Sequence, residues 1–96
     1  MDQIERITHM EEILDEAAGV FAALSEALER YGAVRERLEE LSAYYSGGQW
    51  MQDLDDDRDG KIPKDLKRGV LSEDAVYDLL LEEAWLKERL RELGEA

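Results

Sequence analysis

Cysteine is absent from this 96-residue chain, and histidine and proline occur only once each. Without cysteine the chain can form no disulfide bond, no thiol nucleophile and no thiolate metal site. Nucleophilic and phosphoryl-transfer catalysis also lack the residues they need, because His9 stands alone and no glycine-rich phosphate loop is present. The sequence therefore predicts a protein that is not an enzyme and that has no cofactor, apart from the calcium ion considered below.

Long apolar runs and positive charges are also scarce. No apolar run is long enough to span a membrane, and the N-terminal residues lack the basic flank and apolar stretch of a secretory signal. The 25 acidic residues outnumber the 12 basic ones and give a net charge of −13, which repels nucleic acids and anionic lipids. We therefore expect a cytoplasmic protein that binds neither nucleic acid nor membrane directly and that favours basic protein surfaces or cations.

Helical periodicity is the dominant feature of the N-terminal half. From Ile7 to Tyr45 an apolar residue recurs every three or four positions with no proline. This pattern predicts one long amphipathic helix over residues 2–45, about 66 Å long at 1.5 Å per residue. The apolar stripe consists of Ile7, Met10, Leu14, Ala17, Phe21, Leu24, Leu28, Tyr31, Val34, Leu38, Leu41 and Tyr45. A second row beside it widens the stripe and favours a helix bundle over a two-stranded coiled coil.

Glycines mark the end of the first helix and the start of a connector. Gly47 and Gly48 follow the last apolar position of the stripe, which is the usual place for a helix to stop. Residues 46–71 carry many apolar side chains, so we expect a folded connector rather than a solvated linker. The connector should contain short helical turns at Gln49–Leu54 and Pro63–Arg68, the second of them closed by the glycine that follows it.

A second helix is predicted over residues 72–93, with Ser72 as its N-cap. This helix would be about 32 Å long, half the length of the first one. The predicted fold class is therefore all-α, a single domain of residues 1–96 in which a long and a short helix form an antiparallel hairpin. The short helix can cover only half of the long one. We therefore expect a homodimer with a four-helix arrangement, in which the uncovered part of the stripe meets a second copy.

Two groups of residues are candidates for binding a protein partner. The first group lies on the stripe of the long helix and consists of Phe21, Leu24, Leu28 and Tyr31. The second group combines Trp50 with the bases Lys67 and Arg68, because tryptophan and arginine are favoured anchors of protein interfaces. In an alternative interpretation, Trp50 fills the open end of the hairpin and the bases neutralise the acidic run that precedes them.

An acidic segment, Asp55–Ile62, resembles the first eight positions of an EF-hand calcium loop. Asp55, Asp57 and Asp59 would supply oxygen ligands, and Gly60 would make the sharp turn. The match then fails, because a proline follows and no glutamate occupies position twelve. Calcium binding would therefore be weak, and the other interpretation is a solvated acidic turn.

Acidic residues also dominate the long helix between Ile7 and Glu29, where six acids and no lysine or arginine occur. These acids are Glu11, Glu12, Asp15, Glu16, Glu26 and Glu29. On the outer face of a long helix, such charges can imitate a nucleic-acid backbone and occupy a basic protein groove, as a phage-type inhibitor would. The simpler interpretation is a solvated helix face.

The stretch from Pro63 to Leu80, with its Leu-Lys-Arg-Gly-Val-Leu-Ser-Glu-Asp core at residues 66–74, is similar to a characteristic segment of a known family. The runs Gln3–Ile7 and Gly48–Asp53 resemble the same family, so the likeness covers nearly the whole chain. The family is an uncharacterised bacterial one, a domain of unknown function (four-two-nine-eight) typified by short acidic helical proteins. The resemblance implies a helical fold and supplies no activity, cofactor or catalytic residue.

The function expected from these features is that of a small, acidic, non-catalytic protein–protein interaction module with an unidentified protein partner. Two alternatives come from different classes of function. One is an acidic inhibitor or nucleic-acid mimic that occupies a basic groove, and the other is a weak calcium-binding protein.

Overall fold

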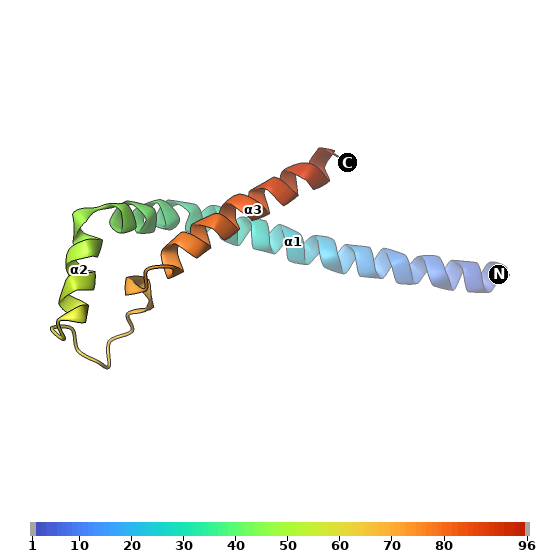
Figure 1. Cartoon of the computed structure of the whole chain (residues 1–96). Helices are drawn as coiled ribbons and strands as arrows, with labels where there is room; N and C mark the ends of the chain where they lie inside the picture. Colours follow the sequence, from blue (N-terminus) through green and yellow to red (C-terminus); the bar gives the residue numbers. More distant parts are fainter. Residues whose placement is uncertain (1, 96) are drawn as a thin grey trace. The chain divides into compact units, whose positions relative to one another are not determined.

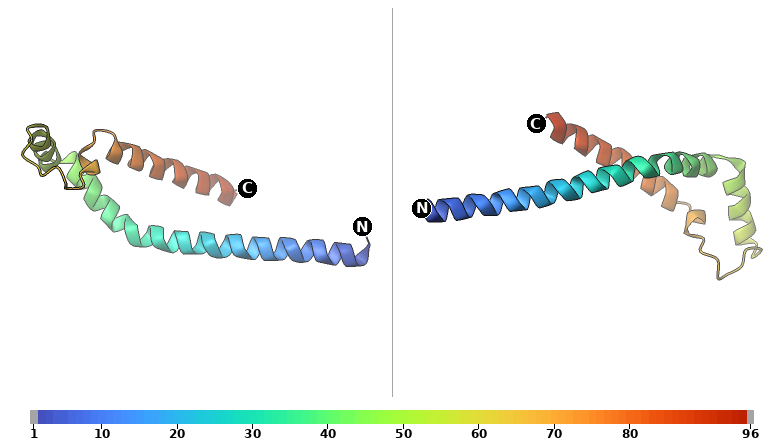
Figure 2. Two further views of the ribbon diagram at one scale, coloured as in Figure 1. Left: turned by 90° about the horizontal axis from the view of Figure 1, so that it is seen from below. Right: turned by 180° about the vertical axis from the view of Figure 1, so that it is seen from behind.

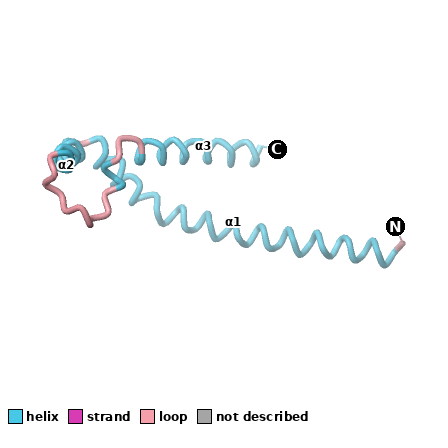
Figure 3. Tube along the Cα trace, turned by 60° about the horizontal axis from the view of Figure 1, so that its bottom comes forward, coloured by secondary structure: helices cyan, strands magenta, loops and turns pink. Residues whose placement is uncertain are grey.

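The computed structural model describes residues 2–95, and within this range the chain is entirely helical and loop, with no strand (Figures 1 and 3). The elements in chain order are α1 (Gln3–Ser46), α2 (Gly48–Arg58), the 3-10 helix η1 (Gly69–Leu71) and α3 (Ala75–Glu95). The prediction of an all-α fold with a long first helix is confirmed. Of the predicted single domain, residues 1 and 96 lie outside the described residues.

Helix α1 has nearly the bounds that its periodicity predicts, and both views of Figure 2 show it without interruption. Its N-terminus is capped by Asp2, whose Oδ1 accepts a hydrogen bond from the Glu5 backbone N–H at 2.8 Å. At the other end, the Gly47 N–H donates to the Tyr44 carbonyl at 3.1 Å. A Cβ atom at Gly47 would lie 3.2 Å from the Ala43 carbonyl oxygen, so the chain turns most easily here without a side chain.

The chain divides into two units, Met1–Arg37 and Leu38–Ala96, which we call unit 1 and unit 2. Unit 1 contains most of α1, and no residue within Gln3–Ser46 is buried. Unit 2 contains the last turns of α1 together with α2, η1 and α3. The antiparallel hairpin of the long and the short helix stays a prediction.

Unit 2 has a small apolar core at the junction of its helices. Trp50 and Leu54 lie four residues apart on one face of α2, and they pack with Leu71 of η1. Tyr44 and Tyr45, near the end of α1, pack against this cluster. The rings of Tyr45 and Trp50 meet edge to face with 4.8 Å between their centroids. This core holds α2, which leaves the end of α1 at a steep angle (Figure 1).

The connector differs from its prediction because α2 is longer than the expected turn at Gln49–Leu54. The helix continues to Arg58, and the Gln52 side chain bonds to Asp56 one turn later at 3.0 Å. Gly60 then ends the helix with a positive φ of 76°. The Lys61 N–H reaches back to the Asp56 carbonyl at 2.9 Å, which is the pattern of a glycine-terminated helix.

The second half of the connector also differs from the prediction. The expected helical turn at Pro63–Arg68 is reduced to one hydrogen-bonded turn, in which the Leu66 N–H donates to the Pro63 carbonyl at 3.2 Å. Gly69 begins η1 rather than closing a helix. Helix α3 starts at Ala75, three residues after the predicted cap. The Ser72 N–H completes η1 through the Gly69 carbonyl at 3.0 Å, and the first bond of the α-helical type runs from the Asp78 N–H to the Asp74 carbonyl at 2.8 Å. Asp74 therefore stands where Ser72 was expected.

Candidate interaction surface

The apolar residues of unit 1 form an exposed stripe along α1. Phe21 is 69% exposed, and Leu24 and Leu28 are exposed to 46% and 47%, respectively. Tyr31 is half-buried. We define the α1 stripe as Ile7, Met10, Leu14, Ala17, Phe21, Leu24, Leu28 and Tyr31, together with the adjoining row Ile13, Val20, Ala27 and Val34. Exposure of so much contiguous apolar surface is unusual in a soluble monomer.

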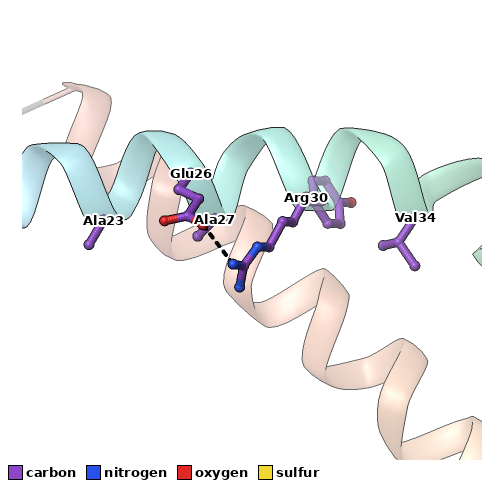
Figure 4. Close-up of a pocket in the computed structure, with 6 residues that line it drawn as sticks. Ala23, Glu26, Ala27, Arg30 and Val34 are labelled. Atoms are coloured by element: carbon purple, nitrogen blue, oxygen red, sulfur yellow. Dashed lines mark hydrogen bonds and ion pairs between the residues drawn. The ribbon is translucent and has the colours of Figure 1, made fainter.

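A shallow hollow lies along one edge of the stripe, where side chains are small. Its lining comes from α1 alone and consists of Ala23, Glu26, Ala27, Arg30, Tyr31 and Val34. Figure 4 shows the short side chains of Ala23 and Ala27 beside the longer Arg30, which reaches back to Glu26. The Arg30–Glu26 ion pair measures 2.6 Å, and both side chains are mostly exposed. Residues spaced by three, four and seven along a helix form the hole that receives a side chain from a partner helix.

Charge is distributed unevenly along α1. Its first half carries the exposed acids Glu11, Glu12, Asp15 and Glu16, whereas its second half adds the exposed bases Arg30, Arg35 and Arg37 among further acids. Exposed charges this far apart on one helix are screened from each other.

Trp50 does not belong to an exposed recognition surface. It is 7% exposed, and its indole N–H donates to the Val70 carbonyl at 2.9 Å, so the polar atom of the ring is also satisfied. Trp50 is therefore a core residue of unit 2, packed with Leu54 and Leu71, rather than an exposed anchor.

Lys67 and Arg68, the two bases predicted beside Trp50, differ in their surroundings. Arg68 is half-buried and forms an ion pair with Asp57 near the end of α2, so it ties the connector to that helix. Lys67 is exposed. The structure therefore does not bring Trp50, Lys67 and Arg68 together as one exposed patch.

The calcium loop expected at Asp55–Ile62 is not formed, because its first four residues belong to α2. Alternate residues of a helix point in nearly opposite directions, so Asp55 and Asp57 cannot converge on one ion as they would in a loop. Asp57 is engaged by an arginine, and Gly60 serves as the helix stop. Within residues 2–95, no group of three or more acidic, histidine or cysteine side chains could hold a metal ion.

Sequence reasoning missed a half-buried polar contact at the junction. The Tyr44 hydroxyl donates to Asp53 Oδ2 at 2.5 Å and joins the end of α1 to α2. This hydrogen bond, helped by burial and by the negative charge of Asp53, raises the pKa of Tyr44 from 10.0 to about 12. The pairing links residues nine positions apart across a helix break, which no periodic pattern predicts.

Tyr44→Phe is expected to destabilise unit 2 by about 1 to 2 kcal/mol at neutral pH, because Asp53 loses its donor. The unfolded chain releases the tyrosine proton near pH 10.0 and the folded chain near pH 12. The contribution to stability is therefore complete below pH 10 and is lost as the pH rises toward 12. Urea unfolding of both proteins at about pH 8 and about pH 11 measures this loss, which the variant should not show. Tyr77→Phe, at a 54% exposed tyrosine, is the control and should behave as the wild type.

Exposed aromatic residues of α3 were also missed. Trp85 is 62% exposed, and the Arg89 guanidinium lies 4.9 Å from the centre of its ring. Tyr77 and Leu81 precede it at intervals of four residues and are exposed as well. That spacing is a visible signal of an apolar face on this helix.

No helix among the described residues is long and apolar enough to cross a membrane.

Comparison with known proteins gives one match. The search found no match among curated proteins and none among solved structures. Residues 7–93 match the family described as Domain of unknown function (DUF4298), which confirms the resemblance seen in the sequence. Since the match covers most of its length, the chain belongs to the DUF4298 family.

Proposed function

We propose that this protein is a non-catalytic interaction module of the cytoplasm whose binding surface is the α1 stripe. The observation that carries the proposal is that α1 extends from Gln3 to Ser46 without a single buried residue. Its apolar side chains therefore remain in contact with water. Each 100 Å² of apolar surface removed from water contributes about 2.5 kcal/mol, so a partner that covers the stripe gains substantial binding energy.

The composition of the stripe supports protein as the binding partner. Phe21 and Tyr31 are aromatic residues of the kind that anchor protein interfaces, and aliphatic side chains surround them. A net charge of −13 disfavours nucleic acids and anionic membranes as partners. A helix that presents apolar residues at intervals of three and four typically binds another helix or an apolar groove.

Capture of partners from host lysate by immobilised protein tests the proposal. Phe21→Asp should abolish capture, because it places a charge at the most exposed aromatic position of the stripe. Ala22→Asp introduces the same side chain one residue later, outside the stripe on the polar side of α1, and should leave capture unchanged. Equal capture by both variants would contradict the proposed surface.

The same experiment at low and high salt separates the apolar surface from the acidic one. A complex made by the stripe should persist at high salt, since salt does not screen apolar contacts. Loss of capture at high salt, with competition by nucleic acid, would instead identify the exposed acids of α1 as a mimic that occupies a basic groove.

A further inference from the structure

We propose that the α1 stripe pairs with the α1 stripe of a second copy of this chain, in antiparallel orientation and with Leu24 opposite the partner's Leu24. This inference rests on the proposed function and names the partner of the same surface. The side-chain sizes along the stripe, the hollow at its edge and the order of charges along α1 each support this register.

The first support is the match of side-chain sizes. In an antiparallel pair centred on Leu24, a residue that precedes Leu24 by a given number of positions lies opposite the partner residue that follows Leu24 by the same number. The small residue Ala17 therefore faces the partner's Tyr31, and both belong to the central row of the stripe. A parallel pair would instead set Ala17 against Ala17 and Tyr31 against Tyr31, which leaves a gap at one level and crowding at the other.

The second support is the hollow on α1. In the same register, Val20 comes within one residue of the partner's Ala27, because the two-fold axis sets the row Ile13, Val20, Ala27 and Val34 against its own copy. Ala27 lines the hollow drawn in Figure 4. The lining residues at positions 23, 26, 27 and 30 have the spacing of a hole that receives one side chain of a facing helix. Val20 is 57% exposed and is therefore available to fill it. The two-fold symmetry of the pair makes this contact twice.

The third support is charge. Glu16 and Arg30 are fourteen residues apart, so they flank the stripe on the same side of α1. A two-fold axis at Leu24 brings this side of each helix together and places Glu16 within reach of the partner's Arg30, twice per dimer. The Arg30 side chain is 78% exposed, so its ion pair with Glu26 leaves it accessible to a second carboxylate. A parallel pair would align the acids of the first half with one another, which is repulsive.

Engineered cysteines test the orientation directly, since the chain has none of its own. Leu24→Cys in the full chain should form a disulfide-linked dimer under mild oxidation, because only a residue on the axis meets its own copy. Ala17→Cys and Tyr31→Cys should not cross-link alone but should cross-link when the two proteins are mixed. Efficient cross-linking of Ala17→Cys with itself would show a parallel pair and overturn the proposal.

Charge reversal tests the register without cysteine. Glu16→Arg should raise the dissociation constant of the dimer about tenfold, because two attractive pairs become repulsive ones. Adding Arg30→Glu to the same chain should restore the wild-type constant, whereas a generic structural defect would not be rescued. Analytical ultracentrifugation of the three proteins at low salt measures the effect, and lack of rescue contradicts the register.

Failure of this inference is distinguishable from failure of the proposed function. If the wild type is a monomer at high micromolar concentration while capture from lysate still depends on Phe21, the stripe binds a different protein and only self-pairing is overturned. If the wild type is a monomer and Phe21→Asp changes nothing in capture, the proposed binding surface is wrong as well.

Discussion

Trp50→Ala is expected to unfold the junction of unit 2. The side chain is 7% exposed and forms one cluster with Leu54 and Leu71. Truncation of a buried tryptophan typically costs about 3 to 5 kcal/mol, and it would also leave the Val70 carbonyl without its indole donor. A core of so few buried residues cannot absorb that loss, so the α2 and η1 segments should lose their fixed structure.

Trp85→Ala is the matched control, because the chain has only these two tryptophans. Trp85 is 62% exposed, so its removal should cost less than about 1 kcal/mol. Thermal unfolding followed by circular dichroism compares the two variants, and the remaining tryptophan in each reports its own surroundings by fluorescence. Equal melting temperatures for the two variants would contradict the role assigned to Trp50.

Leu24→Asp is expected to convert the dimer into a monomer. At the proposed two-fold axis, the substitution brings two carboxylates face to face in an apolar interface, and neither has a cation to pair with. Light scattering should give twice the chain mass of 11.0 kDa for the wild type and a single mass for the variant. Helicity should also fall, because a helix without packing partners is only marginally stable in water. The core of unit 2 should keep its native Trp50 fluorescence.

Ala22→Asp is the control for this substitution. It adds the same charge and a similar loss of helix propensity on the side of α1 away from the stripe. This variant should therefore keep the mass of a dimer. A dimeric Leu24→Asp protein would show that the stripe is not the interface between copies.

The sequence predicted α1 well because one signal, the spacing of apolar residues, continues from end to end. It predicted α2 poorly because glycine has two uses. Gly60 supplies the sharp turn of a calcium loop and equally the left-handed residue that ends a helix. The choice between them depends on the Arg68–Asp57 ion pair and on the core that holds α2, and these are contacts through space.

The candidate surface was predictable in part for the same reason. The residues of the stripe follow from periodicity alone, and the hollow follows from the alanines at positions 23 and 27. The place of Trp50 could not be decided from local pattern, because its indole N–H binds a carbonyl twenty residues away. The exposed face of α3 around Trp85 was visible in the sequence as a four-residue spacing.

The absence of any buried residue in α1 also has a consequence for the lifetime of the protein in a cell. Unit 1 taken by itself is a solitary helix, which frays and exposes its backbone to proteases. Pairing with a second helix lowers the fraction of frayed helix by mass action and so slows proteolysis, since only the folded helix binds. Molecules that lack a binding partner would be degraded from their N-terminal third. Degradation would therefore match the abundance of the protein to the abundance of its partner.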